Sequence, residues 1–179
     1  MMNKLCFLIL CIFIVSCSTT PFNTRYANAN WDKIIIAPFG GSLAESAELT
    51  FEHELAVTSS INVIPASMVK ILLTEHDLID TYAQEPEKAL FLLANKISAN
   101  GIIFAEVKST IPSKRNSADL VSNAVEIYAK LVDAKTRTIV AASHQEASAF
   151  FSSPNALVKE VSSESIGEFR EVFTLLSAN

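Results

Sequence analysis

The chain has 179 residues and a formal net charge of −5 at neutral pH. This acidic balance disfavours nucleic acid and anionic membrane surfaces as binding partners. All three cysteines (Cys6, Cys11 and Cys17) lie near the N-terminus. The rest of the chain therefore has no thiol for a disulfide, a metal cluster or nucleophilic catalysis.

The first sixteen residues have the layout of a secretory signal peptide. Lys4 supplies a positive charge, residues 5–15 are apolar, and the small residue Ser16 stands before Cys17. An apolar run of this length falls short of the roughly 20 residues that a membrane-spanning helix needs. We therefore predict a signal peptide over residues 1–16.

The end of this segment, Ile14-Val15-Ser16-Cys17, resembles the bacterial lipobox. The resemblance implies cleavage between Ser16 and Cys17 and attachment of acyl chains, palmitate among them, to Cys17. It also implies that Ser18, standing where an aspartate would retain the protein at the inner membrane, directs it to the outer membrane on the periplasmic side. Loss of Lys4 with the signal peptide leaves a mature charge of about −6.

Residues 17–30 are expected to form the lipidated cysteine and a polar tether, which would extend to roughly 40 Å. Residues 31–179 are long enough for a single domain with its own core. The apolar run Trp31–Phe39 predicts a strand that is covered on both faces. Gly40-Gly41 ends it, and Ser42 with Glu45 has the spacing of a capping box for a helix to about residue 59.

A second strand over residues 62–65 and a helix capped by Ser67 and ending near residue 76 follow. Pro86 suits the first turn of the next helix, and Gly101 suits its left-handed C-cap. Further strands are predicted over residues 102–109, 125–131 and 138–147, with a hairpin turn over 134–137. Ser153-Pro154 opens a last helix. The order β-α-β-α-α-β-β-β-α predicts an α/β fold: a mixed sheet of about five strands with helices packed on it.

This order resembles a group of bacterial envelope lipoproteins. The group contains the curli-secretion channel lipoprotein, the peptidoglycan-synthase activator lipoprotein B and the Pel polysaccharide export lipoprotein C, with a domain similar to the N-terminal domain of TolB. The resemblance rests on the phrases at Lys33–Phe39, Asn62–Pro65, Ala99–Val107 and Ala129–Thr136. It implies a TolB N-terminal-like domain that serves an envelope machine.

Two departures from the group affect the prediction. Arg137 stands where the group often has glycine after the Lys-Thr of the hairpin. The connections at residues 110–122 and 148–153 are also too short for the membrane-spanning hairpins of the curli channel, because each such strand needs about 9–11 residues. We therefore expect no pore built by this chain.

Catalytic and metal-binding motifs are not evident. His53-Glu54 matches half of a zinc-protease motif, but Val57 stands where the second histidine is needed. His53, His76 and His144 have no metal-ligand spacing among themselves. Gly40-Gly41 precedes a helix without the remaining residues of a phosphate-binding loop, so a structural turn is favoured over an anion site. We expect no enzyme, no cofactor and no metal site.

Three aromatic residues are candidates for a contact surface: Trp31, Phe150 and Phe151. The alternative is that one phenylalanine closes the core under the last helix and the other is incidentally exposed. The function predicted from the resemblance is a non-enzymatic accessory of an assembly or export machine, acting as a homo-oligomer. The alternative is an activator of a peptidoglycan synthase, whose known counterpart uses a long tether; an enzyme or small-ligand carrier ranks third.

Overall fold

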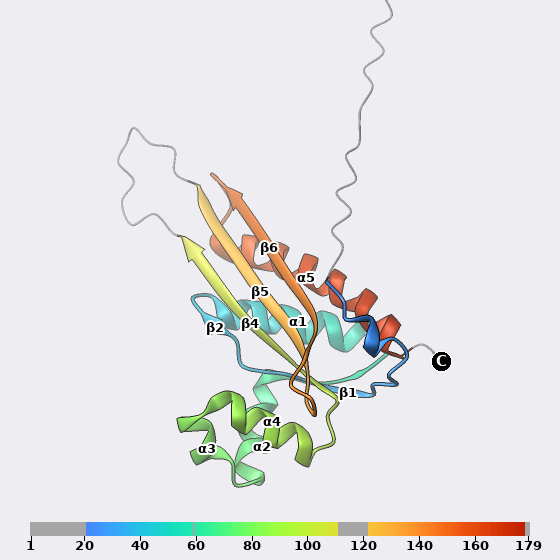
Figure 1. Cartoon of the computed structure of the whole chain (residues 1–179). Helices are drawn as coiled ribbons and strands as arrows, with labels where there is room; N and C mark the ends of the chain where they lie inside the picture. The colour runs from blue at the N-terminus through green and yellow to red at the C-terminus, as the bar shows by residue number, and fades with distance from the viewer. Residues whose placement is uncertain (1–20, 59, 111–121, 178–179) are drawn as a thin grey trace, which may run out of the picture.

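The computed structural model describes residues 21–58, 60–110 and 122–177. It forms one mixed sheet with a helical layer on each face (Figure 1). The strand order is β3-β1-β4-β5-β6, and β2 pairs with β4 off this path. The strands are β1 (Lys33–Ile36), β2 (Gly40–Gly41), β3 (Asn62–Ile64), β4 (Gly101–Thr110), β5 (Asn123–Asp133) and β6 (Ile139–Ala149). The helices are α1 (Ala44–Thr58), α2 (Ala66–Glu75), α3 (Ile79–Gln84), α4 (Pro86–Lys96) and α5 (Pro154–Ser177), with a 3₁₀ turn at Thr24–Tyr26. This confirms the predicted α/β class.

Strand β1 lies between β3 and β4 and runs parallel to both. Its side chains point alternately to the two faces, so Ile34 and Ile36 join one core cluster and Ile35 joins the other. All three isoleucines are fully buried. Because both faces of the strand are buried, its sequence is a continuous run of apolar residues.

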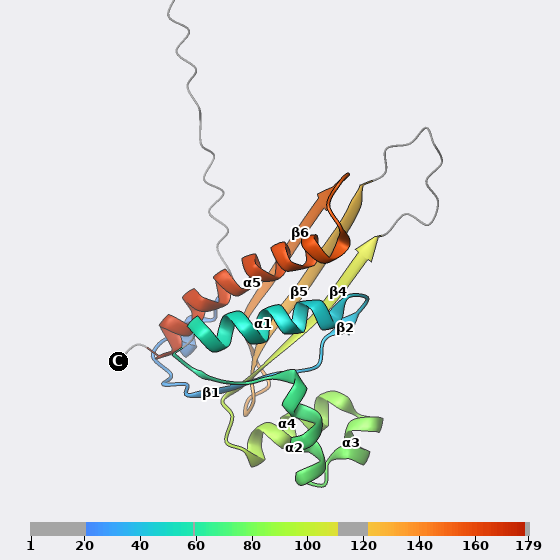
Figure 2. The same ribbon diagram turned by 180° about the vertical axis from the view of Figure 1, so that it is seen from behind.

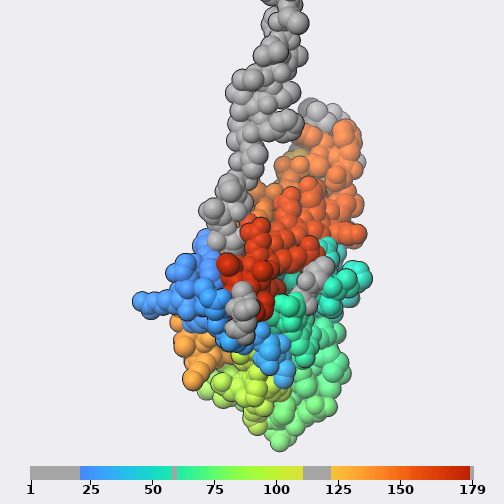
Figure 3. All heavy atoms as spheres, turned by 90° about the vertical axis from the view of Figure 1, so that its right-hand side faces the viewer, coloured from blue at the N-terminus to red at the C-terminus, as the bar shows by residue number. Residues whose placement is uncertain are grey.

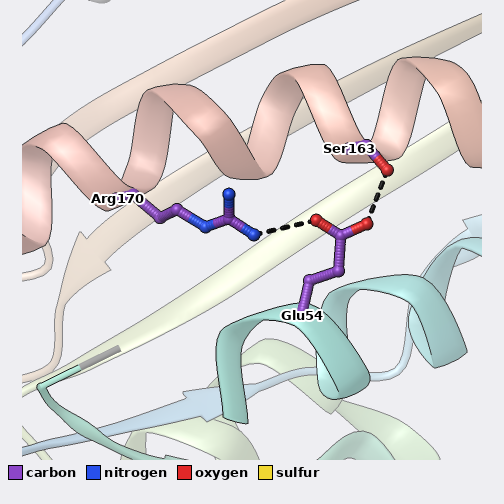
Figure 4. A network of polar contacts seen from close by, with 3 residues as sticks. All are labelled: Glu54, Ser163 and Arg170. Carbon is purple, nitrogen blue, oxygen red and sulfur yellow. Dashed lines mark hydrogen bonds and ion pairs between the residues drawn. The ribbon is translucent and has the colours of Figure 1, made fainter. Parts of the chain in front are cut away.

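Helices α1 and α5 lie side by side on one face of the sheet (Figure 2). Phe51 and Phe169 meet at the centre of this layer, and Phe39 packs edge-on against Phe51 at 5.1 Å between ring centroids. A polar contact also joins the two helices: Glu54 Oε2 lies 2.9 Å from an Nη of Arg170, and Ser163 Oγ donates to Glu54 Oε1 at 2.6 Å (Figure 4).

Helices α2, α3 and α4 form a second layer on the opposite face, near β1 and the start of β4 (Figure 1). Leu73 and Leu93 pack there with Ile35 and Ile102. This layer does not extend along the long strands β4, β5 and β6. The far half of these strands therefore has one face without a helix.

Several predicted helix ends are corrected by the structure. Helix α1 begins at Ala44, and the hydroxyl of Ser42 contacts the hydroxyl of Ser109 at 2.8 Å instead of serving a capping box. Helix α2 begins at Ala66, so Ser67 lies inside its first turn, where its N–H donates to Glu52. The short helix α3 was not predicted, because six residues give too little periodicity to detect.

Gly101 is not a helix cap. Helix α4 ends at Lys96, and Ser98 takes the left-handed conformation (φ 56°) that glycine was expected to supply. Gly101 is instead the first residue of β4, where a Cβ atom would lie 2.4 Å from the Trp31 ring. The glycine is required for close packing of the indole on the sheet.

Residues 21–30 are not a free tether. Phe22 forms a bridge with Ala141 of β6, and Asn28 N–H donates to the carbonyl of Leu175 at the end of α5. Figure 3 shows the blue N-terminal segment lying against the red end of α5. The packed part of the chain therefore begins ten residues earlier than the sequence predicted.

The predicted hairpin between β5 and β6 is confirmed. Asp133 accepts hydrogen bonds from the N–H groups of Lys135 and Thr136, and Arg137 adopts φ 58° where the resembling group often has glycine. The guanidinium of Arg137 lies 5.1 Å from the ring of Phe91 on α4. Within the described ranges, no helix combines the length and the apolar character needed to cross a bilayer.

Candidate functional surface

The predicted lipid-attachment residue Cys17 and the cleavage residue Ser16 lie outside the described residues. The anchor therefore stays a prediction. Any acylated Cys17 would be separated from the packed segment at Pro21 by residues 18–20 alone.

Trp31 is not an exposed contact residue. Its side chain is only 6% exposed and packs edge-on against Tyr26, with ring centroids 5.9 Å apart. The indole therefore belongs to the core, and the prediction of Trp31 as a contact residue was wrong. The sequence around a single aromatic residue does not indicate whether it is buried in the core or exposed for contact.

Phe150 and Phe151 follow the end of β6 and remain candidates. Phe150 is 51% exposed and Phe151 is 96% exposed, so neither closes the core. The Nδ2 of Asn123 donates to the carbonyl of Ser152 at 2.9 Å, which ties this link to the start of β5. The two rings are thus presented together at one end of the long strands.

The edge of the sheet near these rings is accessible for pairing. β6 pairs with β5 on one side, and in the part of the chain that the structure describes its other side meets only the 21–23 segment, at Val140 to Ala142. The remaining backbone groups, from residue 143 to residue 149, offer a row of hydrogen-bond donors and acceptors. Such an edge is a template for association unless it is covered.

We call the uncovered face of β4, β5 and β6 the open sheet face; its side chains are Phe104, Glu106 and Lys108 of β4, Glu126, Tyr128 and Lys130 of β5, and Ala142, His144 and Glu146 of β6. A groove of about 690 Å³ on this face is lined by Phe104, Glu106, Tyr128, Lys130, Ala142 and His144, together with neighbours that include Glu87 of α4. Lys130 lies 5.2 Å from the Phe104 ring centroid and 3.6 Å from a carboxylate oxygen of Glu87 on α4. The groove therefore combines aromatic surface with charges of both signs.

Four side chains form a square in the middle of this face. Glu126 is directly opposite Glu146, and Tyr128 is directly opposite His144. The Tyr128 and His144 rings stack at 4.2 Å between centroids, and Tyr128 donates its hydroxyl proton to Glu126 at 3.1 Å. That hydrogen bond to a carboxylate, with the nearby glutamate charges, raises the pKa of Tyr128.

This square was not predicted from the sequence. Glu126 and His144 are eighteen positions apart and meet only through the register of the β5–β6 hairpin. The two other histidines do not join such a cluster: His53 is on α1 and His76 is at the end of α2. The register shift between Leu131 and Val132 also hides the pair from the sequence, because a register counted from the turn at Asp133 would have placed Gln145, not Glu146, opposite Glu126.

The loop after β1 has a structural role. Gly41 adopts φ 98°, and a Cβ there would lie 1.9 Å from the carbonyl oxygen of Val107, so only glycine permits this pairing of β2 with β4. Gly40 and Gly41, predicted to be a structural turn, instead form the short strand β2.

The N–H of Phe39 donates to Oε1 of Glu48 at 2.6 Å. Burial raises the pKa of Glu48, and the Phe39 hydrogen bond opposes that rise.

No family model and no curated protein sequence matches the chain. Solved structures do match its fold. Two structures of the PelC dodecamer from Paraburkholderia phytofirmans align with TM-scores of 0.54 and 0.51, at 11% and 10% identity, covering 86% of this chain and 94% of theirs. The LpoB C-terminal domain from Escherichia coli aligns with a TM-score of 0.48 at 13% identity, covering 68% of this chain and 85% of its own. PelC is among the proteins that the sequence resembles, and the chain shares its fold.

Proposed function

We propose that this chain is a non-enzymatic lipoprotein of the bacterial outer membrane. Acyl chains on Cys17 hold it on the periplasmic side, where it assembles as a homo-oligomer and serves an envelope-spanning assembly or export machine. The fold that it shares with the PelC dodecamer supports this role. The lipobox resemblance at residues 14–17 supports the anchor.

The observation that carries the proposal is the packing of residues 21–30 on the domain. Three residues, 18–20, then separate the lipidated cysteine from Pro21, and even fully extended they span only about 10 Å. The domain consequently works at the membrane surface. This short reach favours lateral assembly over the alternative function, activation of a synthase across the periplasm.

Lateral assembly also has suitable surface. The outer edge of β6 and the exposed rings of Phe150 and Phe151 lie at the same end of the molecule. A strand edge supplies directional backbone hydrogen bonds, and two exposed aromatic rings supply apolar area that association buries. We assign the subunit contact to this end of the sheet.

The experiment replaces both rings, Phe150→Ser and Phe151→Ser, in the full chain. We expect the detergent-extracted variant to run as a smaller species in light scattering, with its melting temperature unchanged because neither ring is part of the core. Val57→Ser is the matched control, since Val57 is a 74% exposed apolar residue on α1. An oligomer that survives the double substitution would contradict this assignment.

The anchor is tested separately by Cys17→Ala. The variant cannot be acylated, so it should leave the outer-membrane fraction while its domain stays folded. Quantitative retention of this variant in the outer membrane would count against lipid attachment.

A further inference from the structure

We propose that Glu126, His144 and Glu146 bind a divalent transition-metal ion of the zinc type on the open sheet face. This site does not rest on the proposed function, although His144 and Glu146 belong to the strand whose outer edge we assign to the subunit contact. One carboxylate oxygen from each glutamate and one imidazole nitrogen lie within 4.8 Å of one another. Together they supply three ligands, and water completes the coordination.

The register of the hairpin makes the cluster a built arrangement of two strands. Glu126 and Glu146 are a direct cross-strand pair, and His144 is two residues from Glu146 on the same face of β6. Like charges directly opposite each other destabilise a strand pair. A bound cation would convert this repulsion into attraction.

The described residues supply little charge compensation for these two carboxylates. Among the described residues, no lysine or arginine lies within 4.0 Å of a carboxylate oxygen of Glu126 or Glu146; Lys108, the β4 neighbour of Glu126, lies 3.9 Å from Glu106 instead. A bound cation would supply this compensation.

The imidazole is held in place for coordination. The Tyr128 ring stacks on it nearly parallel, with 8° between the planes, which leaves its ring edge free to face the carboxylates. Tyr128 also donates to Oε2 of Glu126, which orients that carboxylate as an outer-shell partner does in metal sites. One aromatic ring thus positions two of the three ligands.

The distances suit zinc after a small closure. Bonds of about 2.0–2.2 Å at tetrahedral angles bring ligand atoms to about 3.4 Å from each other. The present separations, within 4.8 Å, reach this value when the carboxylate groups of the two glutamates each move by about 1 Å. One nitrogen and two oxygens favour zinc over calcium and magnesium, which take oxygen ligands.

The test is calorimetric titration of the detergent-extracted full chain, stripped with chelator, with zinc chloride. We expect one zinc ion per chain. His144→Gln and Glu146→Gln should each weaken binding by about tenfold or more. Addition of calcium at equal concentration should not displace the zinc.

His53→Gln is the matched control, because it removes an exposed imidazole on α1 that lies outside the cluster. Circular dichroism in chelator verifies that each variant is folded. The proposal is overturned if the parent chain binds no zinc. It is also overturned if His144→Gln still binds zinc as the parent does, or if His53→Gln loses binding.

Discussion

The contact between Gly101 and Trp31 fixes how the N-terminal segment joins the sheet. A Cβ at position 101 would also lie 3.1 Å from the carbonyl oxygen of Val132, so neither neighbour leaves space for it. We predict that Gly101→Ala lowers the free energy of unfolding by about 1–3 kcal/mol through overpacking. Urea denaturation monitored by tryptophan fluorescence measures the change.

Gly167 provides the control for this prediction. It lies inside α5 and, apart from its own helix backbone, no atom lies within 4 Å of the position that an alanine methyl would take. Gly167→Ala should therefore raise stability by about 0.5–1 kcal/mol through helix propensity alone. Equal effects of the two substitutions would show that the indole does not require the glycine.

Glu48 should make stability depend on pH. Burial, with the charges of Glu52 and Glu45, raises its folded-state pKa above the ordinary value of 4.5. The folded state then holds the proton more tightly than the unfolded chain, so stability falls as pH rises from 4.5 through the raised pKa. Glu48→Gln keeps an acceptor for the Phe39 N–H and removes this penalty.

Melting temperatures at several pH values, from about 4 to about 8, test the role of Glu48. The glutamine variant should gain stability relative to the parent as pH rises, and the gain should vanish at the acidic end. A difference that is constant across this range would mean that Glu48 titrates alike in the folded and unfolded chains.

At the scale of single residues, the roles that could be predicted from the sequence are those that depend on local backbone geometry. The N-terminal proline of α4 and the hairpin turn at Asp133 are examples. Contacts that depend on tertiary placement were not predicted. Trp31 was wrongly predicted to be a contact residue because its burial depends on packing against Gly101, which is distant in the sequence.

The pairing of α1 with α5 depends partly on the contact of Glu54 with Arg170 and Ser163. This contact is half-buried, so water screens it less than a surface pair. We predict that Glu54→Gln lowers the free energy of unfolding by about 1 kcal/mol, since it removes the charge and retains one acceptor oxygen. Chemical denaturation at low and high salt measures this loss, which should shrink as salt increases.

Glu106→Gln is the control for the predicted effect of Glu54→Gln on the α1–α5 contact. Glu106 faces Lys108 at 3.9 Å with more than half of each side chain exposed, so its substitution should change stability by less than about 0.5 kcal/mol. If both substitutions cost the same, the helix pair is held by its aromatic core alone.

Most elements were predictable because their patterns are local. The alternation in β5 and the apolar run of β1 follow directly from which faces are buried. The segment at residues 21–30 was missed for the opposite reason. It is polar and aperiodic, and it is fixed by hydrogen bonds to β6 and α5 that no local pattern indicates.

At the scale of the whole molecule, the two helical layers cover the sheet unevenly. The α1–α5 layer runs along the long strands, whereas the α2–α4 layer covers only the end near β1 (Figures 1 and 2). This leaves the open sheet face and the tip with Phe150 and Phe151 available for ligands and partners. The proposed subunit contact and the proposed metal site both lie on these surfaces.

Native mass spectrometry of the detergent-extracted protein tests the central claim most directly, because one spectrum reports both the N-terminal modification and the number of subunits. We predict a closed oligomer in which every chain begins at Cys17 and carries acyl groups. A monomer with an unmodified N-terminus would contradict the account.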